Sequence, residues 1–223
     1  MPVRRRTRIG IGAFGNRRDP DEHGREVLRR ILSQRLPLTE DAVFLCLWHQ
    51  LRSRSGSLVL RNVRTSKGTG SLVYRFQPDV DLLEVTKTGK VIGYELKGVQ
   101  GAGKGDIKWP MFYEGFDQAL ALLLNPLSHD KSKKHSIFDE VWLVHPKVTP
   151  SLHAGHYDAA NTGMAEMIRR FAPVGFMTVS HTGIHIEVKA GANPYLDPEL
   201  KAHFLKDLHA FDVYKKFSVK PIQ

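Results

Sequence analysis

Residues 78–97 read PDVDLLEVTKTGKVIGYELK, and this stretch decides the interpretation of the whole chain. Two runs rich in aliphatic residues, 79–85 and 91–98, flank a short polar segment that contains Lys and Gly. Such a pattern predicts a β-hairpin. A five-residue turn would set Val85 opposite Val91.

The same register brings the charged residues of the hairpin together. Side chains alternate between the two faces of a strand, so Asp79 and Asp81 share one face, and Glu95 and Lys97 share one face of the next strand. Asp81 then lies opposite Glu95, and Asp79 lies opposite Lys97, at distances that allow the side chains to interact. A shift of one residue would turn one set to the other face, so the prediction depends on the turn.

Carboxylates gathered on one sheet face are costly unless a cation joins them. Mg²⁺ prefers oxygen ligands and is often held by one or two carboxylates together with a substrate phosphate. Such an ion polarises the phosphate and lowers the pKa of bound water. Lys97 would orient or deprotonate the attacking water, or neutralise the charge that develops on the phosphate. The alternative is a solvated hairpin face with a cross-strand ion pair.

The overall charge indicates a polyanionic partner. The chain has 223 residues and a formal net charge of +10, from 33 Lys and Arg against 23 Asp and Glu. Lys and Arg contacts to phosphates supply most non-specific affinity for nucleic acid, which is the commonest partner of this kind. A basic protein without such a partner is the alternative.

The single cysteine, Cys46, excludes a disulfide framework and a cysteine-based zinc site. The basic N-terminus has no apolar run behind it, which is not the pattern of a signal peptide. No apolar run approaches the ~18 residues that a membrane helix needs. We therefore expect a soluble, intracellular protein of the cytoplasm.

Helical and strand patterns alternate along the chain, which predicts an α/β fold with a central mixed sheet flanked by helices. We expect a basic arm over 1–21 and one domain over 22–223, with a core at about 39–145 and an extension of the sheet and helices over 146–223. The predicted helices cover 22–35, a segment that begins at the N-cap Thr39, 113–124, 159–171 and 197–215. The predicted strands cover 57–63 and 71–76, which would pair with each other, then 79–85, 91–98, 138–145, 175–180 and 184–189.

The pair Pro78-Asp79, followed by Glu95-Leu96-Lys97 at the end of the next strand, resembles the signature of the PD-(D/E)XK superfamily. This superfamily includes restriction endonucleases, Holliday-junction resolvases and the nuclease modules of recombination enzymes. The resemblance covers about 39–145, through the order helix, strands, hairpin, helix, strand. It implies a restriction-endonuclease-like core within the α/β fold.

The resemblance also implies roles for the hairpin residues. Asp79 and Glu95 would bind the metal, and Lys97 would serve catalysis. Asp81 is an alternate to Asp79. The metal would be Mg²⁺, for which Mn²⁺ would substitute.

Members of the superfamily often carry a further Glu on the helix before the first core strand. Glu40 is our candidate for this third metal ligand and Glu26 is the fallback, although either would fit a solvated helix acid equally well. Many members also carry a Gln or Tyr on the helix after the Lys strand, which Gln118 and Tyr113 resemble. Gln118 would bond the lysine, a metal-bound water or a phosphate; a polar residue at a helix start is the alternative.

The segment 98–108 is rich in Gly and contains Lys104 and Lys108. Exposed backbone N–H groups and lysines suit phosphate contact, so we expect these two lysines to bind DNA, unless the segment is a plain loop. Residues 98–104 also begin a P-loop pattern, G-x-x-x-x-G-K, but Gly105 stands where Ser or Thr is needed to bind Mg²⁺.

The sequence thus predicts a Mg²⁺-dependent DNA endonuclease that hydrolyses phosphodiester bonds by in-line attack of water. By analogy with nucleases that cut both strands, the protein would be a homodimer. One alternative is a nucleic-acid-binding module whose nuclease-like core has lost activity. A less favoured alternative is an NTPase that uses the loop 98–104.

Overall fold

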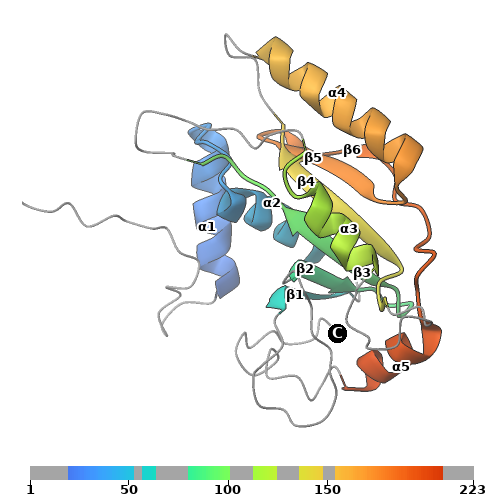
Figure 1. Ribbon diagram of the computed structural model, residues 1–223. Coiled ribbons are helices and arrows are strands. Elements are labelled where there is room, and N and C mark those ends of the chain that lie inside the picture. Colours follow the sequence, from blue (N-terminus) through green and yellow to red (C-terminus); the bar gives the residue numbers. More distant parts are fainter. Residues whose placement is uncertain are drawn as a thin grey trace, which may run out of the picture.

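A computed structural model describes residues 20–52, 57–63, 80–100, 113–124, 136–147 and 154–207. The described residues form a six-stranded mixed β-sheet with helices on both of its faces (Figure 1). This arrangement confirms the predicted α/β class with a central mixed sheet flanked by helices. In this part of the chain, no helix is both long enough and apolar enough to cross a membrane.

The strands follow one another across the sheet in chain order. They are β1 (Leu58–Val63), β2 (Val80–Val85), β3 (Val91–Leu96), β4 (Glu140–Pro146), β5 (Gly175–Ser180) and β6 (Gly183–Val188). The first three strands are antiparallel neighbours, β3, β4 and β5 run parallel, and β6 turns back antiparallel to β5. Parallel neighbours need crossover connections, which α3 (Phe116–Leu124) and α4 (Ala154–Phe171) supply.

The β2–β3 hairpin has the predicted register. Val85 pairs with Val91, and Leu82 pairs with Tyr94. The turn is closed by the hydrogen bond from Gly89 N to the Thr86 carbonyl at 2.9 Å, and Gly89 has a φ of +75°, a left-handed conformation that suits glycine. One position further along the same register, Asp81 lies opposite Glu95.

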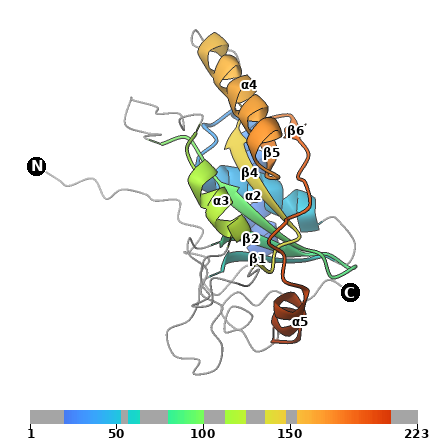
Figure 2. The same ribbon diagram turned by 45° about the vertical axis from the view of Figure 1, so that its right-hand side comes forward.

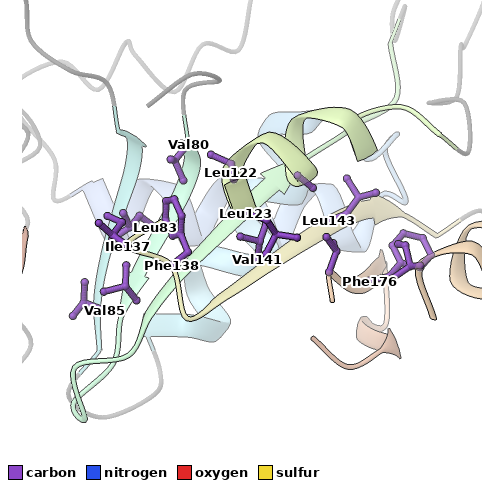
Figure 3. Packing of buried hydrophobic residues seen from close by; sticks show 14 of the residues in the cluster. Val80, Leu83, Val85, Leu122, Leu123, Ile137, Phe138, Val141, Leu143 and Phe176 are labelled. Atoms are coloured by element: carbon purple, nitrogen blue, oxygen red, sulfur yellow. The ribbon is translucent and has the colours of Figure 1, made fainter. Parts of the chain in front are cut away.

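The sheet separates two hydrophobic clusters. On one face, α3, α4 and α5 (Pro198–Asp207) cover a cluster that includes Leu83, Leu122, Val141, Ile168, Phe176 and Phe204 (Figure 3). On the other face, α1 (Pro20–Ser33) and α2 (Glu40–Arg52) cover a cluster that includes Leu47, Leu51, Leu82, Tyr94 and Trp142. Strand β3 is buried along its whole length, so a polar side chain on it needs a specific reason to be there.

Capping groups explain several helix boundaries. Helix α1 ends before Arg35, which has a φ of +47°, and Leu36 N closes the end by donating to the Ile31 carbonyl at 3.0 Å. Thr39 caps α2 as predicted, because its Oγ1 accepts a hydrogen bond from Ala42 N at 3.4 Å. Asp197 caps α5 in the same way, with bonds of 3.0 Å from the N–H groups of residues 199 and 200.

Two crossover helices begin at different residues from those predicted. Helix α3 begins at Phe116 instead of 113, because Gly115 has a φ of +82°, which a right-handed helix does not allow. Helix α4 begins at Ala154, five residues before the predicted start. In Figures 1 and 2, α4 lies at one end of the sheet and α5 at the other.

Several predicted segments lie outside the described residues. They include residues 1–19 of the arm, the strand 71–76, and residues 101–108 of the loop 98–108. Strand β1 was expected to pair with 71–76; its described partner is β2. The division of the chain into arm, core and extension stays a prediction.

Candidate active site

The beginning of α2 is held against the end of β3. Gly98, which directly follows Lys97, lies so close to Thr39 and Glu40 that a Cβ atom would overlap their backbone. Val99 N donates a hydrogen bond to the Leu38 carbonyl at 2.9 Å. Glu40, in the first turn of α2, is therefore fixed beside the strand that carries the predicted catalytic residues.

Glu95 and Lys97 form a largely buried ion pair on one face of β3. Lys97 Nζ donates to Glu95 Oε1 at 2.6 Å, and the two side chains are 13 % and 2 % exposed. Glu95 Oε2 is buried and, within the described part of the chain, accepts no hydrogen bond. A buried carboxylate oxygen without a donor is energetically costly. A cation bound beside this oxygen would supply the partner that it lacks.

Two further acids act on this pair. Asp81 comes from β2, and its Oδ2 accepts a hydrogen bond of 2.8 Å from Leu96 N. Burial, then repulsion by Asp81, raises the pKa of Glu95; Glu40 contributes a smaller repulsion, and the ion pair with Lys97 opposes the shift. Three acids therefore act at the end of β3, and the single positive charge of Lys97 does not neutralise all of them.

Lys97 keeps its proton in this environment. Burial lowers the pKa of Lys97, but the hydrogen bond with Glu95 and the charges of Glu95, Asp81 and Glu40 outweigh burial, so the pKa lies above its ordinary value. An ammonium group has three N–H donors, and only one is used by Glu95 in the bond given above. Lys97 is therefore a cation that can donate further hydrogen bonds beside the acidic group.

The turn before α3 is attached to the neighbouring strand, β4, through His145. His145, on β4, is 2 % exposed, and its Nε2 donates to the Glu114 carbonyl at 2.9 Å. Its ring packs edge-on against Phe176, with the ring centroids 5.6 Å apart. Burial lowers the pKa of His145 to about 4, with a contribution from the charge of Lys97 and against the hydrogen bond to Glu114, so the ring is neutral at neutral pH.

The structure brings together four of the acidic and basic residues singled out in the sequence: Glu40, Asp81, Glu95 and Lys97. Glu40, and not the fallback Glu26, is the helix acid whose charge acts on Glu95. The alternate Asp81 is present beside Glu95.

The other predicted site residues are not joined to this acidic group by a described contact. Gln118 lies partly buried in the first turn of α3, and its side chain makes no hydrogen bond to another residue of the described ranges. Asp79, Lys104 and Lys108 lie outside those ranges. Sequence reasoning missed His145 and Gly115. His145 could have been noticed because it is the one polar residue in the otherwise apolar run 141–146.

A metal ion needs several ligand atoms that converge on one point. Among the described residues, no three His, Cys, Asp or Glu side chains are grouped so as to hold one. Asp79, a predicted ligand, is not among those residues. Two observations nevertheless fit a divalent cation: the open Oε2 of Glu95, and the surplus charge of Asp81 and Glu40 around it. Oxygen ligands of this kind suit Mg²⁺, which commonly takes only one or two carboxylates from the protein.

No model of a known protein family, no curated protein and no solved structure matches this chain.

Proposed function

We propose that this protein is a metal-dependent DNA endonuclease with a PD-(D/E)XK active site, which hydrolyses phosphodiester bonds. The observation that carries the proposal is the buried pair of Glu95 and Lys97, in which Glu95 Oε2 is left open beside further acids. A carboxylate placed in this way needs a cation, and a lysine beside it suits a reaction in which negative charge develops.

The order of the elements supports the same proposal. Helix α2, strand β1, the β2–β3 hairpin, helix α3 and strand β4 follow one another in the order that the resemblance to the superfamily implies. Glu40 lies on α2 and Glu95 on the second hairpin strand, with Lys97 directly after that strand, as the resemblance expects. We therefore propose a restriction-endonuclease-like core within the α/β fold.

The reaction would be divided among residues of the hairpin and of α2. Glu95 would hold Mg²⁺ together with Asp79 and Glu40, and Asp81 is the alternate to Asp79. When bound, the ion would polarise the scissile phosphate and lower the pKa of the attacking water. Asp81, anchored on Leu96 N, would keep the acidic group aligned with the end of β3.

Lys97 would stabilise negative charge on the phosphate. Its raised pKa favours this role over that of a proton acceptor, because an ammonium group has no lone pair to take a proton. Its hydrogen bond to Glu95 Oε1 fixes the ammonium group. Its other N–H donors make no hydrogen bond to the described part of the chain and would bind phosphate oxygens. Fixed positive charge aimed at developing negative charge is a large source of rate enhancement.

DNA is the proposed substrate because the chain carries a net charge of +10. Lys104 and Lys108 would contact its phosphates. We also propose that the protein is a homodimer that cuts both strands. Mn²⁺ would substitute for Mg²⁺.

The test is a cleavage assay with labelled plasmid, linear duplex, single-stranded and four-way-junction DNA. Each substrate is incubated with Mg²⁺, with Mn²⁺ and with chelator, using wild-type protein and Lys97→Ala. The matched control is Lys201→Ala, because Lys201 is also largely buried and paired with an acid, Asp139, at 2.8 Å, but belongs to α5. Metal-dependent cutting that persists in Lys201→Ala and disappears in Lys97→Ala supports the proposal.

Two results would contradict it. Cutting by Lys97→Ala at the wild-type rate would remove the lysine from the mechanism. DNA binding without cutting of any substrate under any metal condition would favour the binding module that has lost its activity.

A further inference from the structure

We propose that His145 is a positioning residue for Lys97. Through the carbonyl of Glu114, it holds the turn that ends in Gly115 against the side chain of the lysine. The inference rests on the proposed function for its kinetic consequence. Its structural consequence can be measured whether or not the protein cuts DNA.

The sheet places His145 directly beside Lys97. Leu96 pairs with Val144 in the parallel β3–β4 ladder, and Lys97 N donates to the Val144 carbonyl at 2.9 Å. Because side chains alternate along each strand, the next residue of β4, His145, lies on the face of Lys97. The imidazole thus begins next to the lysine and reaches over to the segment that precedes α3.

Gly115, in that segment, lies against the lysine side chain. A Cβ atom at Gly115 would lie 2.5 Å from Lys97 Cε and 3.1 Å from Lys97 Cγ. The φ of +82° also makes any other residue strained at this position. The backbone of Gly115 is therefore packed against the lysine side chain, which has several rotatable bonds and would otherwise sample many rotamers.

The hydrogen bond of His145 holds this contact in place. The Nε2–H group donates to the Glu114 carbonyl at 2.9 Å, one residue before the glycine. The ring is buried against Phe176 and cannot turn toward solvent. A shift of the turn would break this part-buried hydrogen bond and leave the buried His145 ring nitrogen without its acceptor, which is costly.

A neutral ring suits this task better than a charged side chain would. The low pKa of His145 keeps the imidazole uncharged, so that it donates a hydrogen bond without competing with Lys97 for Glu95. An Arg or Lys at 145 would offer the same acids a second cation. The hydrogen bond of His145 goes to the turn, and we propose that the residue acts through the turn.

The experiment measures the freedom of Lys97 directly. Lysine ε-amines are labelled with trace acetic anhydride, and the extent of acetylation at Lys97 and at Lys201 is read by mass spectrometry. Two variants change the histidine: His145→Leu fills the space without a donor, and His145→Gln retains an N–H donor near the position of Nε2. The third variant, Gly115→Ala, adds a methyl group that overlaps the lysine side chain. Lys201 is the internal reference, because it too is paired and largely buried.

We expect a severalfold rise in labelling at Lys97 relative to Lys201 in His145→Leu and in Gly115→Ala, and a near-wild-type ratio in His145→Gln. If the protein cuts DNA, the two disruptive variants should lose about 100-fold in kcat with little change in KM, the scale of effect that a misplacement of about 1 Å produces. His145→Gln should recover most of the loss.

An unchanged labelling ratio in His145→Leu and Gly115→Ala would overturn the inference. An equal rise at both lysines would also overturn it, because it would mean general loosening of the fold. Absence of cleavage by the wild-type protein would end the proposed nuclease function, and the labelling ratios would still decide whether His145 positions Lys97.

Discussion

Glu84 and Glu95 are both fully buried, lie on adjacent strands of one hairpin, and face opposite sides of the sheet. Both oxygens of Glu84 accept hydrogen bonds from neutral donors, Ser57 Oγ at 2.9 Å and Tyr94 OH at 2.7 Å. Glu95 has one oxygen paired with Lys97, and its other oxygen has no donor in the described part of the chain.

Burial of an acid does not by itself indicate a functional site. Buried polar groups in folded proteins are normally satisfied, and Glu84 obeys this rule with two hydroxyl partners. Glu95 departs from it in a place where other acids crowd around the same carboxylate. A buried acid that is left open among like charges is a candidate for function, and a buried acid that is closed is a candidate for stability.

Changing each carboxylate to an amide should separate the two roles most strongly. Glu95→Gln should lower metal-dependent cleavage by about a thousandfold or more, because it removes a charge that holds the metal, an effect worth several kcal/mol. Glu84→Gln should cut DNA at close to the wild-type rate. Single-turnover cleavage with excess protein measures both. Similar losses in the two variants would remove the distinction between the open and the closed carboxylate.

Stability should show the opposite pattern. Glu84→Leu should lower the free energy of unfolding by about 4 kcal/mol, since two buried hydroxyl donors lose their acceptor at about 2 kcal/mol each. The double variant Glu95→Leu/Lys97→Met should stay within about 1 kcal/mol of wild type or exceed it, because a buried ion pair is often replaced by apolar side chains without loss. Urea unfolding at fixed pH checks both. A double variant that unfolds more easily than Glu84→Leu would contradict the prediction.

The Glu95 face should also respond to acid through His145. The pKa of His145 is lowered to about 4 in the folded protein from an ordinary value of 6.5, so the neutral ring is the form that the fold favours. The corresponding stability is present above pH 6.5 and is lost as the pH falls toward 4, by up to about 3 kcal/mol. His145→Gln should flatten this part of the curve of unfolding free energy against pH. Parallel curves for the two proteins between pH 7 and pH 4 would speak against a buried neutral ring.

The smallest effect should be stabilisation by the metal itself. At a Mg²⁺ concentration ten times the dissociation constant, binding to the folded state adds about 1 kcal/mol to the free energy of unfolding. The increase should occur in wild type and in Glu84→Gln, and should be absent in Glu95→Gln. Thermal unfolding with and without Mg²⁺ measures it. Equal stabilisation of all three proteins would place the metal away from Glu95.

Local rules were enough to predict much of this site. The turn length and the alternation of side chains set the β2–β3 register, and therefore the pairing of the Glu95 strand with the Asp81 strand. The N-cap at Thr39 identified the start of α2, which is where Glu40 lies. Each of these predictions depends on residues that are close together in the sequence.

The remaining features depend on contacts between distant parts of the chain. Glu84 and Glu95 look alike in the sequence, and what separates them is supplied by Ser57 and Tyr94 for the first and by Lys97 for the second. The hydrogen bond from His145 to Glu114 spans 31 residues and arises only when β4 pairs with β3. No periodicity or turn rule anticipates such a bond.

The contact of Gly98 with the backbone of Thr39 and Glu40 has a consequence for how this protein can be altered by evolution or by design. A joint between two main-chain segments contains no side chain that could repack to accommodate a change. The spacing between Glu40 and the end of β3 is thus set by contact between backbone atoms. The apolar residues of α2 can be exchanged for others of similar volume without resetting that spacing, whereas any replacement of Gly98 forces the helix and the strand apart.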